Sequence, residues 1–279
     1  MNAHFEADWL SLREPVDANA RSDALAKLLA KRWSPNRKLG IIDLGAGHGS
    51  NQRWLAPRLP QAQDWTLVDH DKGLLDRAQA ASLPGRVATR TLIADLADWH
   101  LPTRPAPDLV TASALFDLAS TTMIERLAAA LAKHHAAALF ALTVDGHWAC
   151  LDASGKTLED SETDQVRALF NRHQQHDKGL GRALGPEAAR VLPDCLERAG
   201  MNVSVRPSPW LLAAGTDSVI PLARQLLAGW AEAAREQADH EGLARSWIDG
   251  WQRRLLEDLL VGQLGLRVGH VDVLALPAE

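Results

Sequence analysis

The stretch Leu39-Gly40-Ile41-Ile42-Asp43-Leu44-Gly45-Ala46-Gly47-His48-Gly49 decides the fold of this chain. A short apolar run that stops at a cluster of glycines is typical of a buried parallel strand and the turn that follows it. Glycine in that turn lets the backbone approach a ligand closely, because no Cβ atom stands in the way. The stretch therefore predicts a strand, a ligand-binding turn and the start of a helix.

Strands and helices alternate along the first half of the chain. Repeated strand–helix units favour a parallel sheet with helices on both faces. The apolar spacing predicts helices at Asp8–Trp33, Asp71–Ala81 and Thr121–His134, and strands at Trp65–Asp69, Val87–Ile93, Pro107–Ser113 and Ala136–Val144.

The second half departs from simple alternation. A tight turn is expected at Asp145-Gly146, directly after the fifth strand. Helices are then expected at Glu159–Gln175, Pro186–Ala199, Asp217–Gln237 and Gly242–Leu260, with strands at Asn202–Arg206 and Arg267–Leu276. No stretch has the composition of a flexible tether, so we predict one domain with helical insertions.

Composition excludes several classes of protein. The chain has 279 residues, is 46% hydrophobic and 23% charged, and has a net charge of −5, which offers no general attraction for nucleic acid or anionic lipid. No apolar run approaches the roughly 18 residues of a membrane span, and Met1 to Leu10 lacks a secretory signal. Cys150 and Cys195 fit no metal spacing. Reduced thiols and a cytoplasmic location are expected.

An acid at the end of the next strand extends the nucleotide-binding pattern. Asp69 lies twenty residues after Gly49, where a carboxylate can accept hydrogen bonds from the hydroxyls of a ribose. A dinucleotide-binding turn would need glycine at the sixth position, which is Ser50 or Gln52 in the two possible registers. A nicotinamide-dependent oxidoreductase is therefore disfavoured.

The segment Asp43-Leu44-Gly45-Ala46-Gly47-His48-Gly49 resembles the glycine motif of the class I S-adenosylmethionine-dependent methyltransferases. Leu67–Asp71 resembles the family's ribose-binding motif, and Ile93–Leu96 resembles its adenine-binding motif. The resemblance covers about residues 39 to 144, and 268–275 fits the family's last strand. It implies a doubly wound, Rossmann-like α/β fold with a seven-strand mixed sheet, the last strand antiparallel, and a helical lid and insertions.

The resemblance also implies the cofactor site. Residues at the matching positions are expected to bind S-adenosyl-L-methionine: Asp43, Gly45, Ala46, Gly47, Asn51, Asp69, His70, Asp95, Leu96 and Ser113. Arg13 and Arg21 are expected to reach the methionine carboxylate from a lid, because a guanidinium suits a carboxylate. Each arginine could equally be an ordinary surface residue.

Differences from the sequence patterns of the family's subgroups limit the classes of methyl acceptor to be expected. The position after the fourth strand reads Thr111-Ala112-Ser113-Ala114-Leu115-Phe116, without the Asn/Asp-Pro-Pro-aromatic or Pro-Cys elements of nucleic-acid methylases. Asp117 and Asp145 lie near strand ends, but no Asp-Asn pair follows the fifth strand, so no metal is predicted. We expect a small-molecule acceptor, and neither nucleic acid nor a membrane as partner.

His173 is the candidate general base. In the helix Glu159–Gln175, Val166, Leu169 and His173 share one face, and Asp177 lies four residues further on, where it could orient the imidazole. The alternative is a core histidine with an ordinary carboxylate at a helix end. The tryptophans at 230, 247 and 251 are expected in the core, and His270 in the interior.

The sequence thus predicts a methyltransferase that acts on an oxygen or nitrogen of a small molecule. Its expected parts are an N-terminal helical cap (1–34), a cofactor-binding core (35–145), a lid region (146–200), a helical insertion (207–262) and the last strand (263–279). The alternative is a catalytically silent binding or regulatory protein with the same fold. The acceptor and the oligomeric state stay open.

We expect S-adenosylmethionine and S-adenosylhomocysteine to bind with micromolar-range affinity and NAD not to bind, because the glycine turn and Asp69 match only the first pair of ligands. Calorimetric titration of the purified protein with all three checks this. Heat from NAD and none from S-adenosylhomocysteine would contradict it.

Overall fold

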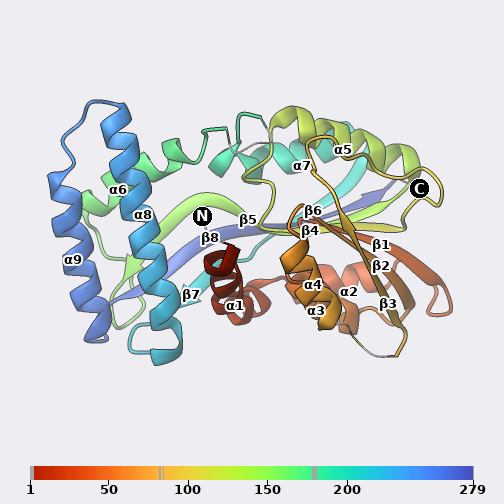
Figure 1. Ribbon diagram of the computed structural model, residues 1–279, viewed down its shortest axis with the longest axis horizontal. Coiled ribbons are helices and arrows are strands. Elements are labelled where there is room, and N and C mark those ends of the chain that lie inside the picture. The colour runs from red at the N-terminus through yellow and green to blue at the C-terminus, as the bar shows by residue number, and fades with distance from the viewer. Residues whose placement is uncertain (1–2, 82, 84, 178–180, 279) are drawn as a thin grey trace.

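The computed structural model describes residues 3–81, 83, 85–177 and 181–278 and is built on an eight-stranded sheet (Figure 1). The strand order is β3-β2-β1-β4-β5-β8-β6, and the short strand β7 pairs with β8. The strands are β1 Lys38–Leu44, β2 Ala62–Asp69, β3 Val87–Ile93, β4 Leu109–Ser113, β5 Ala137–Leu151, β6 Met201–Pro207, β7 Trp210–Leu212 and β8 Gly265–Pro277.

Helices cover both faces of the sheet. They are α1 Ala3–Ala20, α2 Asp23–Ala30, α3 Ser50–Leu55, α4 Lys72–Ala80, α5 Thr121–His134, α6 Ser161–His173, α7 Ala188–Arg198, α8 Ile220–His240 and α9 Ser246–Leu260. In Figure 1, α5 and α7 lie above the sheet, and α2, α3 and α4 lie below its parallel half.

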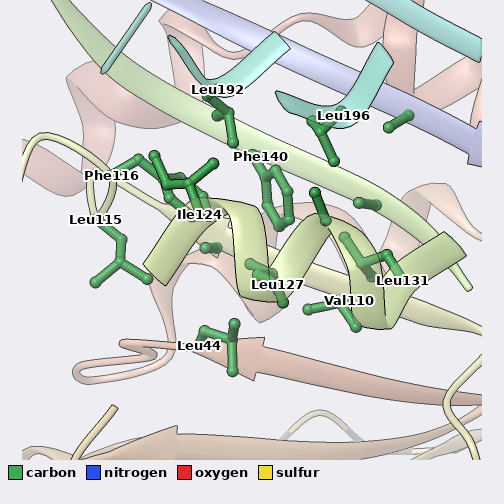
Figure 2. Close-up of a cluster of buried hydrophobic side chains, with 14 of the residues drawn as sticks. Leu44, Val110, Leu115, Phe116, Ile124, Leu127, Leu131, Phe140, Leu192 and Leu196 are labelled. Atoms are coloured by element: carbon green, nitrogen blue, oxygen red, sulfur yellow. The ribbon is translucent and has the colours of Figure 1, made fainter. Parts of the chain in front are cut away.

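Strand β1 shows why the deciding stretch reads as a continuous apolar run. Successive side chains of a strand point to opposite faces. Leu39 and Ile41 pack in the cluster with α2 and α3, whereas Ile42 and Leu44 pack in the cluster with α5 and α7 (Figure 2). Because both faces are buried, the strand is apolar at most positions, and Asp43 is the one ionisable residue in its buried part.

A second apolar core lies beyond the parallel part of the sheet. Strands β5 and β8 are the longest, with 15 and 13 residues, and pair antiparallel along their lengths. Their outer ends, with α6, α8 and α9, bury Trp148, Trp230 and Trp251. Trp251 is fully buried and its Nε1 donates to Thr163 Oγ1 at 2.9 Å. The helices expected as lid and insertion therefore share one core.

The fold class predicted from the sequence is confirmed. Strands β1 to β5 pair in parallel, and the last strand β8 runs antiparallel to β5, as the Rossmann-like pattern requires. The sheet exceeds the predicted seven strands only by β7, a three-residue strand on the insertion side of β8. The division of the chain into five parts stays a prediction.

Two local predictions are wrong. The single helix expected at Asp8–Trp33 is two helices, because the chain turns at Ser22, whose Oγ accepts from Leu25 N at 3.3 Å and caps α2. The tight turn expected at Asp145-Gly146 is a bulge inside β5, where the pairing register shifts and Gly146 has a φ of 76°. The predicted boundary at residue 145 therefore falls within a strand.

Neither cysteine forms a disulfide, and both Cys150 and Cys195 are buried. Burial raises the pKa of the Cys150 thiol to about 12. Within the described part of the chain, no helix combines the length and apolarity that crossing a membrane demands.

Asp272 of β8 joins three distant segments. The residue is 1% exposed. Its carboxylate accepts hydrogen bonds from Ser22 N at 2.6 Å, Leu142 N at 2.8 Å and Ser208 Oγ at 2.6 Å. Leu142 has a φ of 57°, a strained value for leucine, so this contact helps to hold the first bulge of β5. The same carboxylate fixes the start of α2 against the sheet.

Removing this carboxylate is expected to destabilise the protein by about 2–4 kcal/mol, because the buried Leu142 N–H would lose its acceptor. Asp272→Asn should cost less than Asp272→Ala, since the amide oxygen can still accept. Urea denaturation measures both, with Asp249→Ala on the exposed side of α9 as control. Equal stability of Asp272→Ala and wild type would refute the assignment.

Candidate functional site

The glycine turn lies at the carboxyl end of β1 and is tied to β2. Gly45, Gly47 and Gly49 have φ values of 60°, 52° and 85°, which favour glycine. Ala46 N donates to Val68 O at 3.0 Å, and Gly47 N donates to an oxygen of Asp69 at 2.8 Å. The turn is thereby held open at the sheet edge, where ligands bind in such folds.

Asp69 keeps the capacity to bind a ligand. Its residue is 6% exposed, and its two oxygens accept from Gly47 N and from Asp71 N at 2.9 Å. A carboxylate has about four lone-pair positions, so two backbone donors leave room for hydroxyl donors. His70 Nδ1 lies 3.4 Å from the Asp69 carboxylate with a side chain 83% exposed, in reach of the same ligand.

Asp95 and Leu96 follow β3 at the same edge of the sheet. Asp69 pairs in register with Ile93, so Asp95 lies two residues beyond the end of the ladder. Asp95 is exposed and accepts from Ala97 N at 2.9 Å, whereas Leu96 is buried in the core beside α5. The structure therefore brings the predicted ribose-binding and adenine-binding segments side by side.

Asp43 is a buried carboxylate with one oxygen unused. It is fully buried, and Asn51 Nδ2 donates to Oδ1 at 2.8 Å and to Thr111 Oγ1 at 2.9 Å. Oδ2 has no hydrogen-bond partner among the described residues. Burial raises the pKa of Asp43 to about 7, against the opposing effects of the Asn51 hydrogen bond and the Arg21 charge. Asn51 acts here by positioning Asp43.

Arg21 supplies the opposite charge. Its side chain has no exposed surface, and its Nη2 donates to Ser113 Oγ, at the end of β4, at 3.0 Å. Within the described part of the chain, Nε and Nη1 are buried without an acceptor. Burial lowers the pKa of Arg21, and Asp17 with its oxygen 3.9 Å away opposes that shift. Unused charged groups of both signs thus face the end of the central strands.

The N-terminal helix covers the glycine turn. Glu14 of α1 binds Arg53 of α3 through both carboxylate oxygens, at 2.8 and 2.7 Å, and lies 3.3 Å from His48 Nε2. Leu10 lies so near Gly47 that an added Cβ there would come within 3.4 Å of its Cδ1. The helical cap predicted for residues 1–34 is therefore clamped over the predicted cofactor site.

The side chain of Arg13 lies in different surroundings from that of Arg21. Its guanidinium makes two hydrogen bonds to Asp17, at 3.0 and 3.3 Å, and lies over the Trp210 ring with 5.1 Å to the centroid. The geometry therefore supports Arg21 and not Arg13 as the partner of a methionine carboxylate.

A cavity of about 290 Å³ adjoins the end of β4. It opens beside Ala114, the residue after Ser113, and is enclosed by residues of α1, α6, α8 and the outer ends of β5 and β8. Its walls contain Trp9, Arg13, Asp117, Phe170, Asn171, Trp148, Trp210, Trp230 and His270. Its place between the glycine turn and the second core suits a methyl acceptor.

His173 and Asp177 lie outside the cavity walls, and their role as a catalytic pair stays a prediction. His173 is the last residue of α6, its Nε2 lies 2.9 Å from Glu236 Oε2, and it is absent from the cavity walls. The residues of α6 and its C-terminal end that line the cavity are Phe170, Asn171 and Gln174. Asp177 lies beyond the end of α6, and its backbone forms an isolated antiparallel β-bridge with the backbone of Arg182.

Sequence reasoning missed most of the cavity. Trp9, Trp148 and Trp210 come from three separate elements, and the tryptophan-rich composition was the available signal. Trp230 is buried in the core as predicted, yet one side of it also reaches the cavity. His270 is buried as expected, and burial lowers its pKa to about 3. Among the described residues, no cluster of three or more potential ligands is placed to hold a metal ion.

Comparison with known proteins identifies the class. Residues 41–138, which run from β1 to the start of β5, match the family model described as a methyltransferase domain. This segment belongs to that family, within the class I S-adenosylmethionine-dependent methyltransferases, which use S-adenosylmethionine as methyl donor. None of the curated proteins matches the chain significantly.

The chain is also similar to solved structures, of which the first named here supports the fold. The YcgJ protein from Bacillus subtilis is 12% identical, with 92% of this chain and 100% of that chain covered and a TM-score of 0.51. The cyclopropane synthase MmaA2 from Mycobacterium tuberculosis is also 12% identical, with 98% and 95% covered and a TM-score of 0.49. Phosphoethanolamine N-methyltransferase 2 of Haemonchus contortus is 14% identical, with 98% and 60% covered and a TM-score of 0.42.

Asp69→Ala is expected to weaken binding of S-adenosylhomocysteine by about 2–4 kcal/mol, or roughly 30- to 900-fold, because charged hydrogen bonds to the ribose and the tie to Gly47 are lost. Asp69→Glu should weaken it less. Calorimetry measures both, with Asp64→Ala at the far end of the same strand as control. A folded Asp69→Ala protein with wild-type affinity would exclude Asp69 from the site.

Proposed function

We propose that this chain is an S-adenosylmethionine-dependent methyltransferase that methylates an oxygen or nitrogen atom of a small-molecule acceptor. The observation that carries the proposal is the pair of unused buried groups, Asp43 Oδ2 and the Nε and Nη1 of Arg21, beside the glycine turn. The amino-acid end of the cofactor has an ammonium and a carboxylate, which would satisfy both. Such buried charges are costly unless a partner compensates them.

The remaining assignments follow the sheet edge. Asp69 would accept from the ribose hydroxyls, and the segment of Asp95 and Leu96 would contact adenine. The glycine turn lets the cofactor pass close to the backbone between these two ends. The sulfonium would then lie near Ser113 and Ala114, where the cavity begins.

Methyl transfer needs little from the protein beyond alignment. A lone pair of the acceptor forms the new bond to carbon while the carbon–sulfur bond breaks and its electron pair stays on sulfur. Holding the two reactants in line and excluding water supply much of the rate. An acceptor that carries a proton must also lose it. Asp117 places a carboxylate in the cavity wall for that role, whereas His270, with a pKa of about 3, is too weak a base.

The size of the cavity supports a small acceptor. A volume of about 290 Å³ is in the range of small-molecule sites. The cyclopropane synthase and the phosphoethanolamine N-methyltransferase act on different acceptor atoms, so fold alone does not choose among them. A cytoplasmic location stays a prediction from the sequence.

The alternative is a silent binding protein. Incubation with methyl-labelled S-adenosylmethionine and a panel of hydroxyl and amino acceptors separates the two functions. Transfer of label to an acceptor supports the enzyme, and tight cofactor binding without transfer over the panel favours the binding protein.

Affinity for S-adenosylhomocysteine is expected to rise about tenfold between pH 6 and pH 8, because the ligand's ammonium favours the Asp43 carboxylate, whose pKa is raised to about 7. Binding should release a proton, measured by calorimetry in buffers of different ionisation heat. Asp43→Asn should lose this pH dependence, and His70→Gln should keep it. The same raised pKa makes the ligand-free fold lose stability as the pH rises from about 4 to about 7.

A further inference from the structure

We propose that the cavity beside Ala114 binds a flat, uncharged aromatic molecule of one or two rings that carries a hydroxyl or amino group. That this molecule is the methyl acceptor rests on the proposed function. The inference starts from the walls, where five aromatic side chains meet: Trp9, Trp148, Phe170, Trp210 and Trp230.

Part of the wall is a cluster of aromatic rings in mutual contact. Trp148 and Trp230 stack with ring centroids 3.8 Å apart and an interplanar angle of 10°, and each residue is 3% exposed. Phe170 meets Trp230 edge-on at 6.4 Å. Aromatic pairs gain about 0.5–1.5 kcal/mol beyond the burial of their area, so such walls favour a ring over an aliphatic chain.

The volume limits the size of the ligand. A cavity of about 150 Å³ is known to accept benzene. The cavity here, at about 290 Å³, therefore has room for one or two fused rings.

Three polar atoms of the walls lack partners. Trp148 Nε1, Trp210 Nε1 and Asn171 Oδ1 are buried with no hydrogen-bond partner in the described part of the chain, although Asn171 Nδ2 donates to Gly146 O at 3.0 Å. Leaving such atoms unsatisfied costs about 1–3 kcal/mol each. Two N–H donors and one oxygen acceptor match the lone pairs and the proton of a hydroxyl or an amine.

The formal charges of the cavity wall, on Arg13 and Asp117, are of opposite sign and select neither a cation nor an anion. Aromatic walls can bind quaternary ammonium groups. Here the indole N–H groups are donors, and Arg13 already lies over the Trp210 ring with 5.1 Å to the centroid. His270, whose ring centroid lies 5.0 Å from that of Trp210, donates from Nδ1 to Val268 O at 3.1 Å and is neutral near pH 7 because burial lowers its pKa to about 3. An uncharged ligand suits a wall in which Arg13 is already paired with Asp17 and Asp117 carries the opposite charge.

Calorimetric titration of the full chain, with and without saturating S-adenosylhomocysteine, tests the inference with three probes. We expect 2-naphthol to bind at least tenfold more tightly than trans-decahydro-2-naphthol, which has the same skeleton without the flat ring, and choline not to bind. Trp210→Phe keeps the ring and removes one donor, so its affinity for 2-naphthol should fall about three- to tenfold. Trp247→Phe, outside the cavity, should match wild type.

Each other outcome of these titrations contradicts one stated part of the inference. Equal binding of the two naphthol probes overturns the aromatic class, and tighter binding of choline replaces it by a cation. Wild-type affinity of Trp210→Phe means that water alone satisfies the indole. S-adenosylhomocysteine affinity is measured on every variant. Its absence in wild type overturns the proposed function, whereas the titrations without it still report on the cavity.

Discussion

The arrangement depends on one buried cation. The Arg21 guanidinium lies among three buried carboxylates, Asp17 of α1, Asp43 of β1 and Asp272 of β8, and donates to Ser113 at the end of β4. A buried charge must be compensated, so these groups fix the N-terminal cap, the central strands and the last strand relative to one another. The compensation is incomplete, because Arg21 and Asp43 keep unused polar atoms. The constraint that assembles the cap also prepares a site for a zwitterion.

The two parts of the sheet, each with its own apolar core, carry different parts of the candidate site. The parallel part of the sheet, covered by α2, α3, α4, α5 and α7, carries the glycine turn and the acids that we propose to bind the cofactor. The outer ends of β5 and β8, covered by α6, α8 and α9, carry the tryptophans of the cavity. The bulges in β5 lie between these parts. They turn the strand away from regular pairing and open its edge toward the cavity.

The wrong predictions share a physical cause. The helical break at Ser22 depends on its contact with Asp272, which lies 250 residues away in the sequence. The supposed turn at Asp145-Gly146 is a strand because β8 supplies a partner on its far side. In each case a partner distant in sequence overrides a local pattern.

The sequence by itself determined the order of strands and helices, the glycine turn and the positions of Asp43, Asp69 and Asp95, because these follow from periodicity and from spacing along one short segment. Tertiary structure alone decided which arginine faces Asp43, since Arg13 and Arg21 lie two helical turns apart and only packing separates their surroundings. It also decided the acceptor cavity, whose tryptophans come from α1, β5, β7 and α8. Residues so far apart in the chain meet only when the sheet and its two cores have formed.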